Sequence, residues 1–192
     1  MFENRSDRFR AVLAASATVL GVAIVAMGGI AIAAQDRFTV QVPNGLSFSE
    51  FRGYEKWQMI GVSQSGNLIE VILGNPTMIE GYEAGIPGNG KHFPDGAKMA
   101  KIHWNTTKNA EGFPITVPDT LHDIDFMVKD SKRFADSGGW GFAAFEYSPA
   151  SDTFRPGNAT DMPPQANDAK CGFACHTVAA AKDYVFTPFP KR

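Results

Sequence analysis

Two cysteines and a histidine near the C-terminal end form the most recognisable chemical motif of the chain. Cys171, Cys175 and His176 stand in the order Cys-Gly-Phe-Ala-Cys-His and include both cysteines of the 192-residue sequence. This order resembles the C-x-x-C-H signature of c-type haem attachment, with one additional residue between the cysteines. Each thiol could form a thioether with a haem vinyl group, and the following imidazole could bind the iron. We therefore predict one covalently attached haem, held by Cys171 and Cys175, with His176 as the iron ligand.

Other uses of the cysteine pair agree less well with the rest of the sequence. A zinc site normally needs four ligands, and the sequence contains no second cysteine pair. A thioredoxin-like motif would follow an early strand, whereas this pair lies close to the C-terminus. A structural disulfide is the simplest remaining alternative.

The composition indicates one globular domain without affinity for nucleic acid. A chain of 192 residues can form one domain with a substantial core. The formal net charge is only -2 at pH 7, so no basic surface is expected. The 15 Phe, 4 Tyr and 3 Trp suit a pocket for a flat apolar macrocycle, although core packing explains most of them equally well.

The first 34 residues have the layout of an export signal. Arg5, Arg8 and Arg10 precede the uncharged stretch 11–34, which ends in Ala-Ile-Ala-Ala. A basic start, an apolar stretch and an A-x-A site are typical of a signal peptide, but the stretch is also long enough to span a bilayer once. We predict a signal peptide or N-terminal membrane anchor over 1–34, with cleavage favoured, and a haem domain over 35–192. The domain is then expected in the periplasm, either soluble or anchored to the inner membrane.

The rest of the chain predicts strands more often than helices. Hydrophobic alternation and turn residues predict strands over 38–44, 57–62, 68–73, 97–104, 123–129 and 140–147, with a hairpin between the second and third. Short helices are expected after Ser47, over 77–84 and after His176, and loops over 85–96, 105–111 and 148–168. This order predicts an α+β fold and excludes an all-helical cytochrome, whose 3.6-residue periodicity is missing.

The strand predicted over 97–104 has two unlike faces. Its alternate residues are Ala100, Ile102 and Trp104 on one face, and Met99, Lys101 and His103 on the other. If the tryptophan face packs into the core, Lys101 and His103 must face solvent or a cavity. His103 is expected to be a hydrogen-bonded strand histidine rather than an iron ligand, while His92 and His122 are expected in loops.

Several short segments, taken in order and spacing, resemble the cytochrome P-460 family. They are Ile-Leu-Gly-Asn at 72–75, the pattern F-P-x-G-x-x-x-x-K-x-x-W at 93–104, Phe-Met-Val-Lys-Asp at 126–130, Gly-Gly-Trp-Gly-Phe at 138–142, and the cysteine motif. The resemblance implies a mainly antiparallel β-sheet with flanking helices, a homodimer, and one c-type haem with an open distal side. Catalytic members of the family oxidise hydroxylamine, with nitrous oxide as a product.

The resemblance also assigns a lysine to the haem. The family's lysine, which forms an additional covalent bond to the haem edge, falls on Lys101, with Lys98 as the neighbouring alternative. Oxidation of hydroxylamine also needs a distal proton carrier, and a buried carboxylate with a raised pKa suits this role. Glu146 and Asp168 are the predicted carboxylates, although both could be surface acids. Phe142 could instead cover the iron with an apolar ring.

Two functions follow from these residues. The first is an enzyme that oxidises hydroxylamine, using Lys101, a carboxylate and an electron-accepting cytochrome. The second is a non-catalytic cytochrome on the same fold that binds nitric oxide or carbon monoxide, as the related beta-type cytochromes c-prime do. The Lys101 match favours the enzyme, and the abundance of phenylalanine suits the gas-binding protein.

Overall fold

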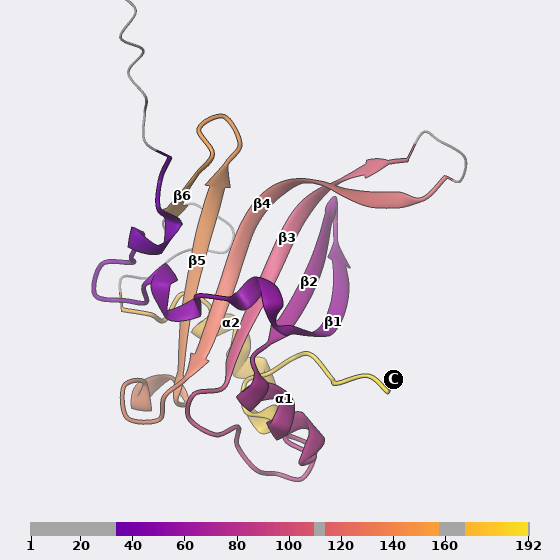
Figure 1. Ribbon diagram of the computed structural model, residues 1–192. Helices are drawn as coiled ribbons and strands as arrows, with labels where there is room; N and C mark the ends of the chain where they lie inside the picture. Colours follow the sequence, from indigo (N-terminus) through magenta and orange to yellow (C-terminus); the bar gives the residue numbers. More distant parts are fainter. Residues whose placement is uncertain (1–33, 110–113, 158–167, 192) are drawn as a thin grey trace, which may run out of the picture. The chain divides into compact units, whose positions relative to one another are not determined.

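A six-stranded antiparallel sheet forms the framework of the protein (Figure 1). The computed structural model describes residues 34–109, 114–157 and 168–191. Within them the strands lie in chain order: β1 (Gln58–Ser65), β2 (Leu68–Gly74), β3 (Lys98–Lys108), β4 (Thr116–Lys129), β5 (Trp140–Ser148) and β6 (Thr153–Pro156). Each strand pairs with the next in antiparallel orientation, which confirms the predicted α+β fold with a mainly antiparallel sheet.

Short helices accompany the sheet. The α-helices are α1 (Pro76–Glu83) and α2 (Phe173–His176), and the 3-10 helices are η1 (Arg37–Thr39), η2 (Phe48–Phe51), η3 (Tyr54–Lys56), η4 (Ala135–Ser137) and η5 (Thr177–Lys182). Ser47 caps η2 and forms a capping box with Glu50, as its sequence position predicts. Asn75 caps α1 by accepting a hydrogen bond from the Met78 backbone, and Pro76 fits the first helical turn.

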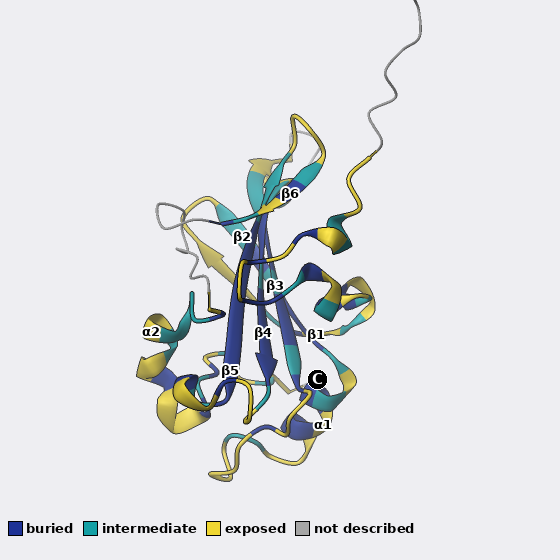
Figure 2. Ribbon diagram, turned by 90° about the vertical axis from the view of Figure 1, so that its left-hand side faces the viewer, coloured by how far each residue is buried: buried dark blue, intermediate teal, exposed yellow. Residues whose placement is uncertain are grey.

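The two faces of the sheet differ chemically. Figure 2 views the sheet from its edge, with α2 to one side of the strands. One face packs against η2 and η3 in a phenylalanine-rich core, where Phe51 stacks on Phe126 with ring centroids 4.1 Å apart. The other face is covered by α2 and the C-terminal segment, and we call it the mixed face because it carries apolar and charged side chains. On β3, Ala100 and Ile102 belong to the phenylalanine core, so the predicted division of this strand is confirmed.

Some expectations about local structure were wrong. The strand or extended arm expected over 38–44 begins in η1 and continues to a single bridge between Gln41 and Ser47, and Asn44 then turns the chain at a positive φ of 55°. The loop expected over 105–111 is strand as far as Lys108, because its threonines suit a long hairpin with β4. His122, which was also expected in a loop, lies in β4. The loop expected over 148–168 contains β6, and residues 158–167 lie outside the described part of the chain.

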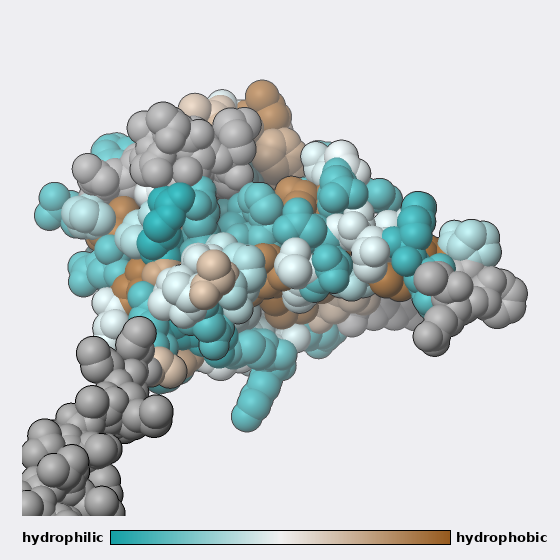
Figure 3. All heavy atoms as spheres, turned by 90° about the horizontal axis from the view of Figure 1, so that it is seen from above, coloured by the Kyte–Doolittle hydropathy of each residue, from teal (hydrophilic) through white to brown (hydrophobic). Residues whose placement is uncertain are grey.

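The predicted signal peptide or anchor lies almost wholly outside the described residues, which begin at Ala34. Among the described helices, none is long and apolar enough to cross a membrane. Seen from above, the described surface is mostly hydrophilic with apolar patches between the polar side chains (Figure 3).

Candidate functional site

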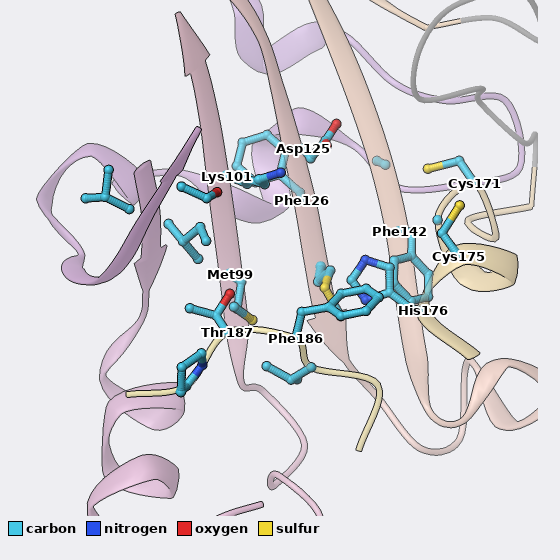
Figure 4. A pocket seen from close by; sticks show the side chains of 18 residues that line it. Met99, Lys101, Asp125, Phe126, Phe142, Cys171, Cys175, His176, Phe186 and Thr187 are labelled. Carbon is cyan, nitrogen blue, oxygen red and sulfur yellow. The ribbon is translucent and has the colours of Figure 1, made fainter. Parts of the chain in front are cut away.

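A cavity of about 470 Å³ lies between the mixed face of the sheet and the C-terminal segment. This volume is typical of sites for small molecules and cofactors. Its lining is mostly apolar and consists of Val62, Ser63, Ile72, Met99, Lys101, Asp125, Phe126, Met127, Phe142, Ala143, Cys171, Gly172, Cys175, His176, Val185, Phe186, Thr187 and Pro188. Figure 4 shows Lys101 and Asp125 on the central strands, and the cysteine motif at the other end of the cavity. The fold therefore unites the motif with the lysine that the sequence analysis singled out.

The imidazole of His176 is held in one orientation and one tautomer. Its Nδ1 lies 2.7 Å from the backbone carbonyl oxygen of Tyr184, which can only accept, so Nδ1 must carry the proton. The remaining nitrogen, Nε2, then presents a lone pair. Burial lowers the pKa of His176, although the bond to Tyr184 opposes this effect. A neutral, oriented imidazole of this kind is the usual form of a metal-ligating histidine.

The two cysteines lie at the same end of the cavity as His176. Cys171 and Cys175 both contribute to the cavity wall. Their four-residue separation is the spacing that brings side chains to one side of a helical turn, and α2 begins between them at Phe173. The additional residue in the motif is thus compatible with both thiols facing one ligand.

Backbone contacts hold the motif against β5. The Phe142 amide donates to the Ala169 carbonyl at 2.7 Å, just before the motif begins. A Cβ atom on Gly172 would lie 2.9 Å from the Phe142 ring, so this close approach requires glycine. The Phe142 ring also lies 5.0 Å from the His176 ring, between centroids. Phe142 therefore packs beside the predicted iron ligand, on the same side of the cavity.

These residues fit a haem. The site offers a neutral imidazole with a free lone pair, two thiols, and an apolar lining that includes Met99, Met127 and Phe142. His176 would hold the iron, and Cys171 and Cys175 would attach the macrocycle.

Lys101, rather than Lys98, lies at the cavity. Lys101 Nζ is 2.8 Å from Glu70 Oε2, and its side chain is 35% exposed. Lys98 Nζ instead donates to the Glu50 carbonyl oxygen and lies 5.6 Å from the centre of the Phe51 ring, on the phenylalanine-core side. The structure thus places the family's lysine position in the site.

Glu70 is a buried charged residue that the sequence analysis missed. Burial alone would raise its pKa, but hydrogen bonds from Lys101 and Ser63 outweigh burial and lower it. Glu70 therefore stays ionised beside Lys101. A signal was present in the sequence, because a lone glutamate interrupts the apolar run Leu68 to Leu73.

Asp125 is the carboxylate that the structure brings to the cavity. Asp125 lies directly opposite Lys101 in the pairing of β3 with β4. Its side chain forms part of the cavity wall and is 27% exposed. Its Oδ1 atom is buried and accepts no hydrogen bond from the described residues. Burial raises the pKa of Asp125 to about 7, although the charge of His103 opposes the increase. Asp125 thus has the raised pKa that the sequence analysis expected of another carboxylate.

The structure does not bring Glu146 or Asp168 to the cavity wall. Glu146 lies two residues beyond Ala144, the β5 residue opposite Asp125, and forms an ion pair with Arg155. The Asp168 side chain is 56% exposed, and its Oδ2 lies 3.2 Å from Lys170 Nζ. Neither carboxylate lines the cavity, and neither do their cation partners Arg155 and Lys170.

The chain belongs to the cytochrome P460 family, whose family model matches residues 51–187. Membership implies a haem cofactor, in agreement with the site described above, and confirms the resemblance found in the sequence. The match includes β1 to β6, α2 and the cavity-lining tail as far as Thr187. No individual curated protein gave a significant match to the chain.

Asp125 should make the stability of the protein depend on pH. Its pKa is 3.8 in an ordinary environment and about 7 in the folded protein, so folding favours the protonated form. The resulting stabilisation is complete below the ordinary pKa and is lost as the pH rises through the folded value. The Asn side chain of Asp125→Asn does not titrate. The free energy of unfolding of the variant, relative to the parent, should therefore increase between these two pH values.

Urea denaturation of both proteins across this pH range measures the effect. Glu70→Gln provides a control with the opposite sign, because the pKa of Glu70 is lowered. In the parent, the ionised Glu70 contributes more stability as the pH rises through the range just below 4.5. The free energy of unfolding of Glu70→Gln, relative to the parent, should therefore decrease in that range. A constant difference between Asp125→Asn and the parent would show that Asp125 is solvated as an ordinary carboxylate.

Proposed function

We propose that this chain is a periplasmic c-type haem protein that oxidises hydroxylamine to nitrous oxide. The supporting observation is the meeting of the cysteine motif, Lys101 and Asp125 in one cavity. The haem, when bound, supplies the redox-active iron. Family membership supports the choice of reaction, and the charged wall opposite the motif supports catalysis over simple gas binding.

The reaction defines what the residues of the cavity must do. Conversion of two hydroxylamine molecules to one nitrous oxide and one water releases four protons and four electrons. The electrons require an acceptor, which we propose to be a separate cytochrome. The protons require a base at the cavity, and a carboxyl group whose pKa is about 7 can both accept and release a proton near neutral pH. Asp125 fills that role in the proposal.

Lys101 and Glu70 have a different role. The family resemblance implies that Lys101 is bonded to the edge of the macrocycle, and the 2.8 Å contact with Glu70 holds the lysine at the cavity wall. Export through residues 1–34, with or without cleavage, and assembly into a homodimer complete the proposal. The signal-like N-terminus supports the first, and the family resemblance supports the second.

The test is turnover by the purified holoprotein. Hydroxylamine is supplied with an oxidised c-type cytochrome or a chemical oxidant, and nitrous oxide is measured by gas chromatography. Peptide mass mapping of the same sample should show haem linked to the motif and to Lys101. A saturable nitric oxide complex without hydroxylamine turnover would instead favour the gas-binding function, which the apolar lining from Met99, Met127 and Phe142 also suits.

Serine variants test covalent attachment. The intact mass of the parent protein should exceed that of the mature polypeptide by one haem, even after denaturation. The double variant Cys171→Ser/Cys175→Ser should keep its haem only through Lys101. With Lys101→Arg added, it should lose its haem on denaturation, because neither a thiol nor the lysine amine remains to form a bond. Each single cysteine variant should retain the haem through the remaining thioether. A parent protein that releases its haem on denaturation would contradict attachment through this longer motif.

A further inference from the structure

A row of polar side chains crosses all six strands beside the cavity. Its members are directly paired from strand to strand: Ser63, Glu70, His103, Asp123, Glu146 and Arg155. The neighbouring row, two residues along each strand, includes the cavity residues Ile72, Lys101 and Asp125. We call the first set the polar row. It places buried titratable groups next to the cavity, where simple packing would favour apolar residues.

The centre of the polar row connects the cavity with the protein surface. His103 Nε2 lies 3.9 Å from Asp125 Oδ2, and His103 Nδ1 is hydrogen-bonded to Asp123 Oδ1. The other carboxylate oxygen of Asp123, Oδ2, lies 3.1 Å from His122 Nδ1. His103 and Asp123 are buried, whereas the His122 side chain is 41% exposed. The sequence of groups thus begins at the cavity wall and ends in solvent.

Two of these distances require small movements before a proton can pass. The 3.9 Å between Asp125 Oδ2 and His103 Nε2 is too long for a direct hydrogen bond. The proton therefore crosses after a side-chain rotation or through a bridging water. His122 Nδ1 is close to Asp123 but is not oriented as its hydrogen-bond partner, so the ring must rotate. Ring and side-chain rotations of this size are fast compared with enzyme turnover.

The charged groups around His103 favour the route through Asp123. Glu70 Oε1 also lies 3.8 Å from His103 Nε2, but Glu70 is held ionised by Lys101 and Ser63 and does not readily accept a proton. Burial alone would lower the pKa of His103, but the hydrogen bond to Asp123 and the charge of Asp125 raise it. His103 is thus able to hold a proton near neutral pH, as a relay group must.

We propose that His103, Asp123 and His122 relay protons from Asp125 at the cavity wall to solvent. Asp125 receives a proton released in the cavity and transfers it to His103 Nε2. His103 releases its Nδ1 proton toward Asp123, and His122 passes a proton to water. The number of protons in the relay is unchanged after its side chains return to their starting orientations. This inference rests on the proposed function, since it supplies the exit for protons released by hydroxylamine oxidation.

The first test does not depend on turnover. The holoprotein is prepared as its diamagnetic ferrous carbon monoxide complex, and the imidazole signals of His103 and His122 are followed by NMR through a pH titration. In the parent protein the two histidines should show coupled titration curves, because they share Asp123. In Asp123→Asn the His103 pKa should fall and the coupling should disappear. Independent titration of the two histidines in the parent protein would overturn the relay.

The second test measures proton release during hydroxylamine oxidation. His122→Gln removes the exposed end of the relay, and turnover in weak buffer should fall by about tenfold, a modest share of the usual general acid-base effect. Added imidazole should restore the rate, because a small buffer can take the proton from Asp123. Asp119→Asn, an exposed change on the same strand, should leave the rate unchanged. Parent-like turnover of His122→Gln in weak buffer would contradict the relay.

The two tests separate the relay from the proposed function. A parent protein that does not oxidise hydroxylamine refutes the proposed reaction, and the NMR titration still decides whether the two histidines are coupled through Asp123. Normal turnover with uncoupled histidines keeps the reaction and refutes the relay.

Discussion

The Asp125→Asn variant should lose about 10²- to 10⁴-fold of the hydroxylamine turnover number, the usual contribution of a general base. Asn occupies the same volume but cannot accept a proton, so protons released in the cavity lose their first acceptor. The pH profile should also lose the limb near pH 7 that the raised pKa of Asp125 produces. Steady-state kinetics of parent and variant from pH 5 to 9 measure both effects.

Two comparisons make this result specific. The ferrous nitric oxide affinity of Asp125→Asn should remain close to that of the parent, since diatomic binding needs no proton transfer. Asp119→Asn should show the parent's rate and pH profile, because Asp119 is exposed on the same strand. A larger loss of turnover in Glu146→Gln than in Asp125→Asn would return the proton-accepting role to the residue predicted from sequence.

The Asp183→Ala variant should be destabilised by about 3–5 kcal/mol, the usual cost of leaving one charge of a buried pair uncompensated. Lys129 Nζ donates to Asp183 Oδ1 at 2.7 Å, and both side chains are almost completely buried. Asp183 Oδ2 also accepts a hydrogen bond from the Phe93 amide at 2.8 Å. Asp183 and Tyr184 both have positive φ angles, of 51° and 63°, a strained conformation that these contacts must maintain.

The loss should extend to the haem. The Tyr184 carbonyl that orients His176 follows directly after Asp183, so release of this turn frees the imidazole. Chemical denaturation should report the loss of stability, and the visible spectrum should report altered iron ligation. Exposed Glu83→Ala on α1 is the control, with a change within about 0.5 kcal/mol. Lys129→Met combined with Asp183→Ala should recover part of the loss, and equal stability of Asp183→Ala and the parent would exclude this anchoring role.

Local pattern predicted much of the sheet but not its edges. The alternation at residues 97–104 correctly assigned both faces of β3, because one face of this strand is strongly apolar. The far end of the same strand is polar on both faces, so hydrophobic pattern could not reveal that it pairs with β4. β6 is only four residues long, and its pairing with β5 depends on register rather than composition.

The site was predictable where a motif defines it and unpredictable where strand pairing defines it. The cysteine motif and Lys101 each belong to a recognisable spacing, and the structure places both at the cavity. Asp125 belongs to no motif, and its proposed role follows from its position opposite Lys101 in a neighbouring strand. Glu146 was predicted from the sequence, but it lies two residues along β5 from Ala144, the residue opposite Asp125, and so belongs to the polar row.

The polar row also constrains how the strands align during folding. Side chains alternate between the two faces of a sheet, so a slip of one residue would move Glu70, His103 or Asp123 into the phenylalanine core. Burying a charged group among aromatic rings without partners is very unfavourable. Misaligned pairings of β2, β3 and β4 are therefore selectively destabilised, and the charged residues beside the cavity also specify the native arrangement of the sheet.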